Sequence, residues 1–320
     1  MRVLMVGAGA VGGYFGGRLL QAGRDITFLV RPRRATELAT AGLIIQSPKG
    51  DVTVRNPPTV SSEDIRVKFD LILLSCKAYD LDGAIASFVT AVGPDTMVLP
   101  LLNGMKHLDV LDARFGRAKV LGGLCAIAAT LDARRVVVHL NSIHSLAFGE
   151  REGGLSDRVR AVAKIMVGAG FDARASQSIV LDMWEKWVML ASLAGATCLM
   201  RAPVGDIVSV PGGTELILSL LEECCAIAQD AGFAPHARFI EQTRAMLTAA
   251  GSPFTASMLR DMEGNGPTEA DHVLGDMLRR HAPAAAKRGK LSVLHIAYVH
   301  LKAYEARRAR MLAAAGELGS

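Results

Sequence analysis

The pattern of hydrophobic and polar positions divides the chain into two parts. In the first part, short apolar runs alternate with amphipathic stretches, which predicts strands followed by helices. From about residue 178 the apolar positions recur at helical spacing, with breaks at short stretches rich in glycine and proline. Strands are expected at 2–6, 26–30, 42–46, 52–55, 69–75, 97–102, 136–140, 145–148 and 171–175. Since strands alternating with helices form parallel sheets covered on both faces, we predict an α/β fold, with a parallel-sheet domain at 1–176 and an all-helical domain at 177–320.

A glycine motif lies between the first expected strand and the helix after it. Its sequence is Gly7-Ala8-Gly9-Ala10-Val11-Gly12. Such a motif alone is weak, but this strand–turn–helix context is the one that dinucleotide binding requires. Gly7 permits a tight turn, Gly9 lets the backbone approach a pyrophosphate, and Gly12 lets the helix pack on the strand. The helix N-terminus then offers N–H groups to the anion. We predict a Rossmann-type domain; a glycine-rich turn that binds nothing is the alternative.

The end of the second expected strand indicates which dinucleotide binds. An NAD site would place Asp or Glu about 20 residues after the glycines, to bond the ribose 2′-hydroxyl. This chain has Val30 and Arg31 there, followed by Arg33 and Arg34. A guanidinium holds a 2′-phosphate, which a carboxylate would repel. The sequence therefore predicts NADP(H) bound through Arg31, whereas Arg33 and Arg34 are explained equally well as solvated arginines.

Two further strand ends carry polar side chains. Lys77 follows the strand at 69–75, and Asn103 follows the strand at 97–102. The carboxyl ends of parallel strands meet at the ligand-binding edge of such a sheet, so both are expected beside the cofactor. There they could serve ribose, phosphate or a substrate carboxylate. A surface lysine and an Asn-Gly turn are the structural alternatives.

The helical part contains two more candidates. Lys186 is expected in the first turns of a nearly all-apolar helix that begins at Trp184. A charged lysine is costly to bury, so it either extends to solvent or its pKa falls toward the range useful for protonating a carbonyl oxygen. Glu269 follows Pro267 in what we interpret as a helix start; it could cap that helix or orient a lysine and a substrate hydroxyl.

Composition narrows the classes of partner. Of the 320 residues, 50% are hydrophobic and the net charge is +5, which suits an anionic cofactor and a carboxylate substrate. The basic residues form no aromatic-interleaved motif, so nucleic acid is not an expected partner. Five cysteines without a C-x-x-C pair favour a reducing cytoplasm, and scattered histidines predict no metal site. The longest apolar run, 187–200, is too short for a membrane span, and no signal peptide is recognised. A homodimer through the helices expected at 216–228 and 291–306 is compatible with their apolar surface, which could equally be core.

Taken together, these stretches resemble the ketopantoate reductase (2-dehydropantoate 2-reductase) family over essentially the whole chain. Many dehydrogenases share the glycine motif, and the later motifs are more specific. They are Lys77, Asn103-Gly104-Met105, Glu185-Lys186, and Ser257-Met258-Leu259-Arg260-Asp261 leading to Thr268-Glu269-Ala270-Asp271.

The resemblance implies NADPH-dependent reduction of a 2-keto acid to its 2-hydroxy acid, in a cleft between a Rossmann domain and a helical domain. The substrate it implies is 2-dehydropantoate, whose reduction to pantoate belongs to pantothenate biosynthesis. The implied roles are Lys186 as general acid, Glu269 as support for that lysine and the substrate, Lys77 and Asn103 as contacts to cofactor and substrate, Arg31 as 2′-phosphate ligand, and Ser257 as a substrate-carboxylate ligand.

One departure from the family pattern concerns the substrate. The family places asparagines four and eight residues after the catalytic lysine, where this chain has Leu190 and Ala194. Spacing of four keeps these positions on the face of the helix that carries Lys186. Losing hydrogen-bonding partners relaxes or changes substrate choice. A bulkier or more apolar 2-keto acid is therefore the second hypothesis, and a non-catalytic NADP(H)-binding sensor is the third.

Overall fold

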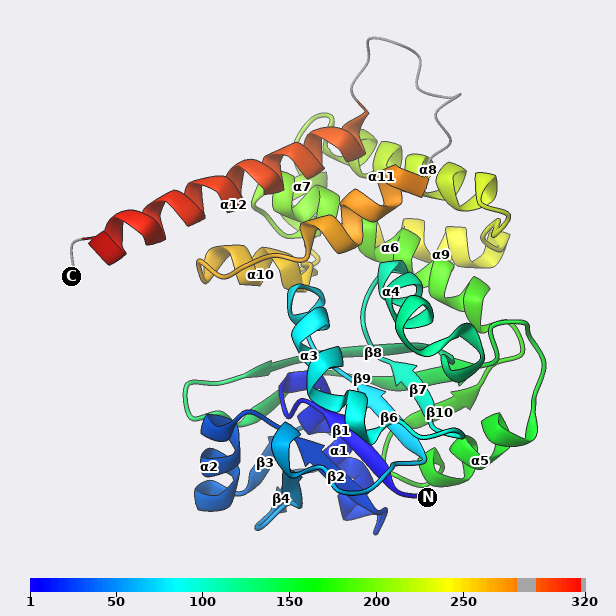
Figure 1. The fold of residues 1–320 in the computed structure, drawn as a ribbon. Helices are drawn as coiled ribbons and strands as arrows, with labels where there is room; N and C mark the ends of the chain where they lie inside the picture. Colours follow the sequence, from blue (N-terminus) through cyan, green and yellow to red (C-terminus); the bar gives the residue numbers. More distant parts are fainter. Residues whose placement is uncertain (281–291, 318–320) are drawn as a thin grey trace. The chain divides into compact units, whose positions relative to one another are not determined.

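The computed structural model describes residues 1–280 and 292–317, which form two compact units (Figure 1). The first unit contains Met1–Leu102 and His107–Met183, and the second contains Asn103–Lys106 and the described residues from Trp184 onward. The division falls later than the expected boundary at 176/177, because the first turn of the following helix packs on the first unit. A Cβ on Gly122 would lie 2.7 Å from Cγ2 of Ile179, in that turn.

The first unit contains the predicted parallel sheet, in the order β5-β2-β1-β6-β7. The chain order reverses between β1 and β6, which is the switch point where such sheets bind ligands. The register pairs Val6 with Leu29 and Leu74, and Leu74 with Pro100, so the carboxyl ends lie level at one edge. The strands are β1 (Val3–Val6), β2 (Ile26–Leu29), β5 (Thr59–Val60), β6 (Leu71–Leu74) and β7 (Met97–Pro100).

A second, mixed sheet lies in the same unit, in the order β10-β9-β3-β4 with β8 paired to β9. The sequence pattern did not predict this separate sheet. The strands expected at 136–140 and 145–148 are one continuous strand, β9, and the long strand β8 was missed. The two strands expected at 42–46 and 52–55 are present as β3 and β4, which pair antiparallel. The strands are β3 (Leu43–Gln46), β4 (Val52–Val54), β8 (Gly122–Leu131), β9 (Val137–Gly149) and β10 (Asp172–Ala175).

Helix α1 (Ala10–Gln21) packs against β1 and β2 on one side and against the second sheet on the other. Its Tyr14, Phe15 and Leu19 are fully buried in the resulting core. The remaining helices of this unit are α2 (Pro32–Ala41), α3 (Leu81–Phe88), α4 (Lys106–Phe115) and α5 (Asp157–Met166), with the 3₁₀ turns η1 (Ser62–Asp64), η2 (Ala78–Asp80), η3 (Val89–Ala91) and η4 (Arg117–Lys119).

The second unit is helical, as predicted. Its longest described helix, α12, is red in Figure 1 and packs against α8 and η5. We expect a helix at 291–306, and the first residue of that range, Leu291, lies outside the described residues. None of the described helices combines the length and apolar character needed to cross a bilayer. The helices are α6 (Ile179–Met200), α7 (Val204–Val208), α8 (Gly213–Asp230), α9 (Ala237–Leu247), α10 (Ser257–Glu263), the π-helix η5 (Asp271–Gly275), α11 (Asp276–Arg280) and α12 (Val293–Glu317).

Candidate functional site

The glycine turn after β1 is built closely around a serine at the end of β6. Gly7 has φ +95°, a left-handed conformation that L side chains rarely adopt. A Cβ on Gly12 would lie 2.2 Å from Oγ of Ser75 and 2.3 Å from the Gly7 carbonyl oxygen, so any side chain there would displace the turn. The Ser75 hydroxyl donates to the Val6 carbonyl at 2.9 Å. Ser75 therefore joins β6 to the turn, a role that the sequence pattern did not indicate.

The same turn leaves room on its outer side. A Cβ on Gly9 would meet no heavy atom within 4 Å, and Gly9 is the N-cap of α1. The first turn of α1 carries no acidic residue. Free backbone N–H groups at such a helix start, with no opposing carboxylate, are suited to a pyrophosphate. The first unit thus has the backbone geometry that the motif predicts.

Arg31 lies just beyond β2, as the N-cap of α2, with a side chain that is 79% exposed. Its Nη2 is 3.0 Å from Oδ1 of Asp80. Lys77 is the N-cap of η2 and accepts a hydrogen bond from the Asp80 amide at 2.9 Å. Arg31 and the Lys77–Asp80 turn therefore lie side by side within the first unit. Asp80 was not among the sequence candidates, and its carboxylate is an unexpected neighbour for an arginine predicted to bind a phosphate.

In the second unit, Lys186 and Asn103 contact each other directly. The Lys186 ammonium donates to Oδ1 of Asn103 at 3.0 Å, although 83 residues separate them along the chain. Lys186 is only half-buried. Its helix begins at Ile179 and not at Trp184, so Lys186 lies about two turns inside α6. The positive end of the helix dipole therefore has little effect on this lysine, because that effect falls off within one turn.

Trp187, the next residue, links this pair to the segment that follows Glu269. The indole N–H of Trp187 donates to the carbonyl of Val273 at 2.8 Å. Gly104, with φ +76°, comes so close to the same segment that a Cβ would lie 2.9 Å from the His272 carbonyl oxygen. Helix α6, the Asn103-Gly104 turn and the π-helix η5 thus converge. π-helical turns of this kind are frequent at functional sites.

Glu269 itself is buried, at 8% exposure, and its carbonyl accepts the amides of His272 and Val273 at 3.0 and 2.9 Å. The expected helix start at Pro267 is wrong: helical structure begins at Ala270, and the chain before it is instead held by hydrogen bonds to α12. Tyr304 donates to the Gly266 carbonyl at 2.8 Å, Thr268 donates to Glu305 at 2.5 Å, and Tyr298 donates to Asp271 at 2.6 Å. Helix α12 therefore fixes the segment that carries Glu269.

The neighbouring acid, Glu185, has a structural task. Its Oε1 accepts both the amide and Nδ1 of His236 at 2.8 Å. His236 is the N-cap of α9, so the carboxylate satisfies a helix start and opposes its positive end. Glu185 therefore ties α9 to α6 beside Lys186.

The remaining predicted positions lie on α10 and α6. Ser257 is exposed as the first residue of α10, and the preceding Ala256 amide donates to Thr197 of α6 at 3.4 Å. Leu190 is partly buried and Ala194 is 3% exposed. Ser192 is fully buried and donates to the Val188 carbonyl at 2.8 Å, so its hydroxyl offers no replacement for the missing asparagines.

Other chemistry finds little support in the part of the chain that the structure describes. No group of three or more His, Cys, Asp or Glu side chains there could hold a metal ion. None of the five cysteines, all within the described residues, forms a disulfide. Burial raises the pKa of Cys198 and of Cys224 to about 12, so neither thiol is a ready nucleophile at neutral pH.

A glycine turn of this kind, with an arginine after β2, is typical of NADP-binding domains. A lysine hydrogen-bonded to an asparagine is a suitable proton donor. Together these features indicate an NADP-dependent oxidoreductase. Models of the family "Ketopantoate reductase PanE/ApbA" match residues 3–153, and its C-terminal part matches residues 178–305. The chain belongs to the ketopantoate reductase family, whose members reduce 2-keto acids with NADPH.

Individual relatives agree with this assignment. "Uncharacterized oxidoreductase YkpB" of Bacillus subtilis is 36% identical, over 96% of this chain and all of its own. A 2-dehydropantoate 2-reductase of Nostoc sp. is 24% identical, over 86% of this chain and 87% of its own. The crystal structure of 2-dehydropantoate 2-reductase from Methylococcus capsulatus superposes with a TM-score of 0.81 at 27% identity, covering 96% of this chain and 98% of that one.

Proposed function

We propose that this protein reduces 2-dehydropantoate to pantoate with NADPH, with Lys186 as the general acid. The observation that carries the proposal is the 3.0 Å hydrogen bond from the Lys186 ammonium to Asn103 in a chain of this family. An ammonium held by a neutral amide keeps protons to donate, and its direction is fixed.

The first unit fits NADP(H). The Gly7–Gly12 turn would hold the pyrophosphate, since Gly9 faces open space and α1 begins there. Arg31 would hold the 2′-phosphate in place of Asp80, and Lys77 would contact the cofactor nearby. The surface ion pair between Arg31 and Asp80 is worth at most about 1 kcal/mol, so a phosphate can displace the Asp80 carboxylate. When bound, NADPH supplies the hydride that reduces the carbonyl carbon.

The second unit would supply the proton and the substrate contacts. As negative charge develops on the carbonyl oxygen, Lys186 donates a proton to it and the product is an alcohol. Asn103 orients the ammonium and contacts the substrate. Buried Glu269 orients the lysine and accepts a hydrogen bond from the newly formed hydroxyl group. Ser257 donates a hydrogen bond to the substrate carboxylate. These four roles come from the family resemblance and agree with the chemistry of each side chain.

Leu190 and Ala194 favour a second candidate substrate. Both replace family asparagines on the helix face of Lys186, so that face of α6 is apolar at these two positions. A bulkier or more apolar 2-keto acid bound against this face would gain from it, whereas the hydroxyl of 2-dehydropantoate would lose a partner. Reduction of a different 2-keto acid is therefore the alternative, and an NADP(H)-binding sensor without turnover is the third hypothesis.

Loss of NADPH absorbance with 2-dehydropantoate and a panel of branched and aromatic 2-keto acids tests these hypotheses. We expect turnover of 2-dehydropantoate. A higher kcat/KM for an apolar keto acid would move the assignment to the alternative substrate. Tight NADPH binding without turnover of any keto acid would leave the sensor.

Location and assembly follow the same proposal. Pantothenate biosynthesis would place the protein in the cytoplasm, where its five cysteines, none in a disulfide, stay reduced. A homodimer through the helical unit would cover Ile296 and Val299 on α12, which are 43% and 50% exposed. Size-exclusion chromatography with light scattering measures that state.

A further inference from the structure

Arg34, three residues after the proposed phosphate ligand, is buried against the dinucleotide turn. It is 8% exposed, whereas the adjacent Arg33 side chain is 91% exposed. Each guanidinium nitrogen of Arg34 donates one hydrogen bond. Nε binds the Ala8 carbonyl at 3.1 Å, Nη1 binds Glu37 at 3.1 Å, and Nη2 binds the Arg135 carbonyl at 3.4 Å. Arg34 thus ties the turn after β1 to α2 and to the β8–β9 hairpin, and it is not a solvated arginine.

The bond to Ala8 fixes the orientation of one peptide group. The Ala8–Gly9 peptide is trans and planar, so its C=O and N–H point in opposite directions. With the carbonyl directed at Arg34, the Gly9 N–H is directed away from α2. Gly9 is the residue around which the turn leaves open space. Holding the carbonyl therefore holds the N–H that the dinucleotide turn presents to an anion.

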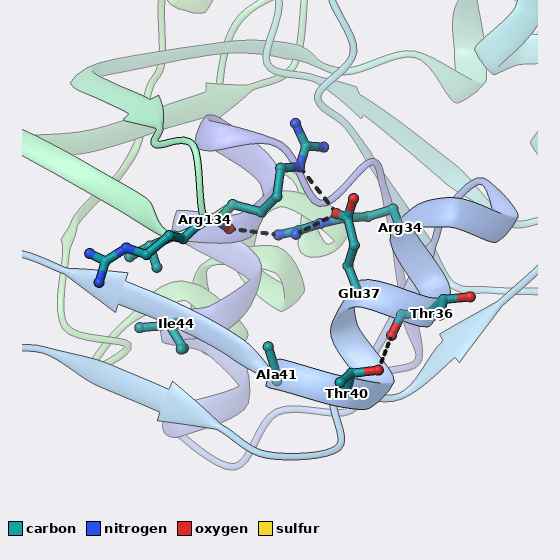
Figure 2. Close-up of a pocket in the computed structure, with 10 residues that line it drawn as sticks. Arg34, Thr36, Glu37, Thr40, Ala41, Ile44 and Arg134 are labelled. Carbon is teal, nitrogen blue, oxygen red and sulfur yellow. Dashed lines mark hydrogen bonds and ion pairs between the residues drawn. The ribbon is translucent and has the colours of Figure 1, made fainter.

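Glu37 and Arg135 complete the arrangement, and both line a pocket of about 330 Å³ beside Arg34. Figure 2 shows Arg34 and Glu37 in this pocket. Oε2 of Glu37 accepts from Arg34 and also from Nε of Arg135, each at 3.1 Å. Partial burial disfavours the Glu37 carboxylate, but its hydrogen bonds to Arg34 and Arg135 outweigh this and lower its pKa below the ordinary value. Glu37 is therefore an anion at neutral pH and holds both arginines.

Arg135 adopts a backbone conformation that is uncommon for a side chain of its size. Its φ is +66°, in the left-handed region where glycine or asparagine is usual. The hairpin turn is closed by Asp132, whose Oδ1 accepts the Val136 amide at 2.8 Å. In this conformation Arg135 gives its carbonyl to Arg34 and its side chain to Glu37. The adjacent Arg134 pairs with Asp132 instead, and its side chain is 75% exposed.

We propose that Arg34, Glu37 and Arg135 are positioning residues that hold the Ala8–Gly9 peptide and the first turn of α2 ready for the dinucleotide, and so set its affinity. This inference rests on the proposed function as an NADP(H)-dependent enzyme. The three residues act through the backbone of the turn and contact neither the 2′-phosphate nor the nicotinamide. NADPH and NADH are therefore affected alike, and the chemical step at saturating cofactor is not affected.

Fluorescence titration of NADPH and NADH, with kcat at saturating cofactor, tests this on the intact chain. Arg34→Met removes three hydrogen bonds to a charged group, and we expect Kd to rise about tenfold for both cofactors. Glu37→Gln and Arg135→Ala, which keep the fold more safely, are expected to raise both values about threefold. The kcat of each variant should stay within about twofold of the parent. Arg134→Ala, which removes the same charge from the same turn, is the matched control and should leave both Kd values unchanged.

Two results would overturn the positioning role while the proposed function stood. One is an unchanged Kd in a folded Glu37→Gln or Arg135→Ala variant. The other is a loss confined to NADPH, which would make Arg34 a phosphate ligand. If the unmodified protein bound no NADPH, the proposed function would fail first and this inference with it.

Discussion

Lys186 and Asn103 form a direct hydrogen bond of 3.0 Å between ammonium and amide oxygen. Both belong to the helical unit, although Asn103 follows a strand of the parallel sheet in the chain. The Asn103–Lys106 segment is therefore held by the unit that carries the proposed acid. Gly104 and Trp187, the neighbours of this pair, both meet the η5 segment, so the backbone around the hydrogen bond is fixed on two sides.

Replacing Lys186 tests the proposed acid. Lys186→Ala should lower kcat by about a hundredfold or more, because the alkoxide loses its proton donor, and should leave the Kd of NADPH within about twofold. Stopped-flow reduction and cofactor titration measure the two quantities. Lys164→Ala, an exposed lysine on α5, is the control. A weakened NADPH affinity in Lys186→Ala would show that the lysine serves the cofactor instead.

Asn103 gives a test that depends on charge. Asn103→Asp places a carboxylate 3 Å from the ammonium, which favours the protonated lysine. The alkaline limb of the kcat/KM profile should therefore move to higher pH. Asn103→Ala should lower kcat by about tenfold without that direction of movement, since it removes the orienting acceptor but adds no charge. Identical pH profiles for the parent and Asn103→Asp would separate Asn103 from the reacting proton.

Cofactor selectivity should depend on Arg31 and Asp80 in opposite directions. Arg31→Ala is expected to raise the Kd of NADPH by about tenfold and the Kd of NADH by less than about twofold, because only NADPH carries the 2′-phosphate. Asp80→Asn removes the carboxylate that pairs with Arg31. It should lower the Kd of NADPH about two- to fivefold, which is the range of an exposed ion pair. Equal effects of Arg31→Ala on both cofactors would refute the phosphate assignment.

Sequence reasoning identified the parts of the first sheet that follow local rules. The turn after β1, the absence of a carboxylate after β2, and the polar ends of β6 and β7 depend on short segments whose meaning is local. Strand β8 was missed because Gly122, Gly123 and several alanines lack the β-branched and aromatic residues that mark strands. Polar residues near Asn141 made the continuous strand β9 resemble two strands.

The candidate site shows the same limit. Lys186 and Asn103 were each selected, but nothing local predicts a contact across 83 residues. The sequence did not predict that Arg34 is buried, because nothing local distinguishes it from the exposed Arg31 and Arg33. Only tertiary packing separates Arg34 from these two arginines. The shift of the helix start from Pro267 to Ala270 arises from bonds to α12, which lies far along the chain.

The stability of the helical unit should fall in mild acid because of His272. Burial, and then the charges of Lys106, Arg279 and Arg280, lower its pKa from 6.5 to about 4. Below pH 6.5 the unfolded chain binds a proton that the folded unit does not, so stability is lost between pH 6.5 and 4. The loss from pH 7 to pH 5 is about 2 kcal/mol.

Urea unfolding measures that loss, followed by the fluorescence of Trp184 and Trp187, which both lie in this unit. His272→Gln should remove about 2 kcal/mol of the difference between pH 7 and pH 5. His295→Gln, an exposed histidine on α12, is the control. An equal pH dependence in His272→Gln and the parent would assign the acid sensitivity to other groups.

Leu190 decides between the two substrate hypotheses, because it stands where the family has the first asparagine after the lysine. Leu190→Asn restores a hydrogen-bonding group one turn from Lys186 on the same helix face. We expect it to raise kcat/KM for 2-dehydropantoate and to lower kcat/KM for branched or aromatic keto acids without a hydroxyl, each by about tenfold, the usual range for gaining or losing such a contact. Leu190→Met, which keeps volume and apolarity, should change neither value by more than about twofold. If Leu190→Asn changed kcat/KM for both substrates in the same direction, position 190 would act on the lysine or on helix α6. Other residues would then determine the choice of substrate.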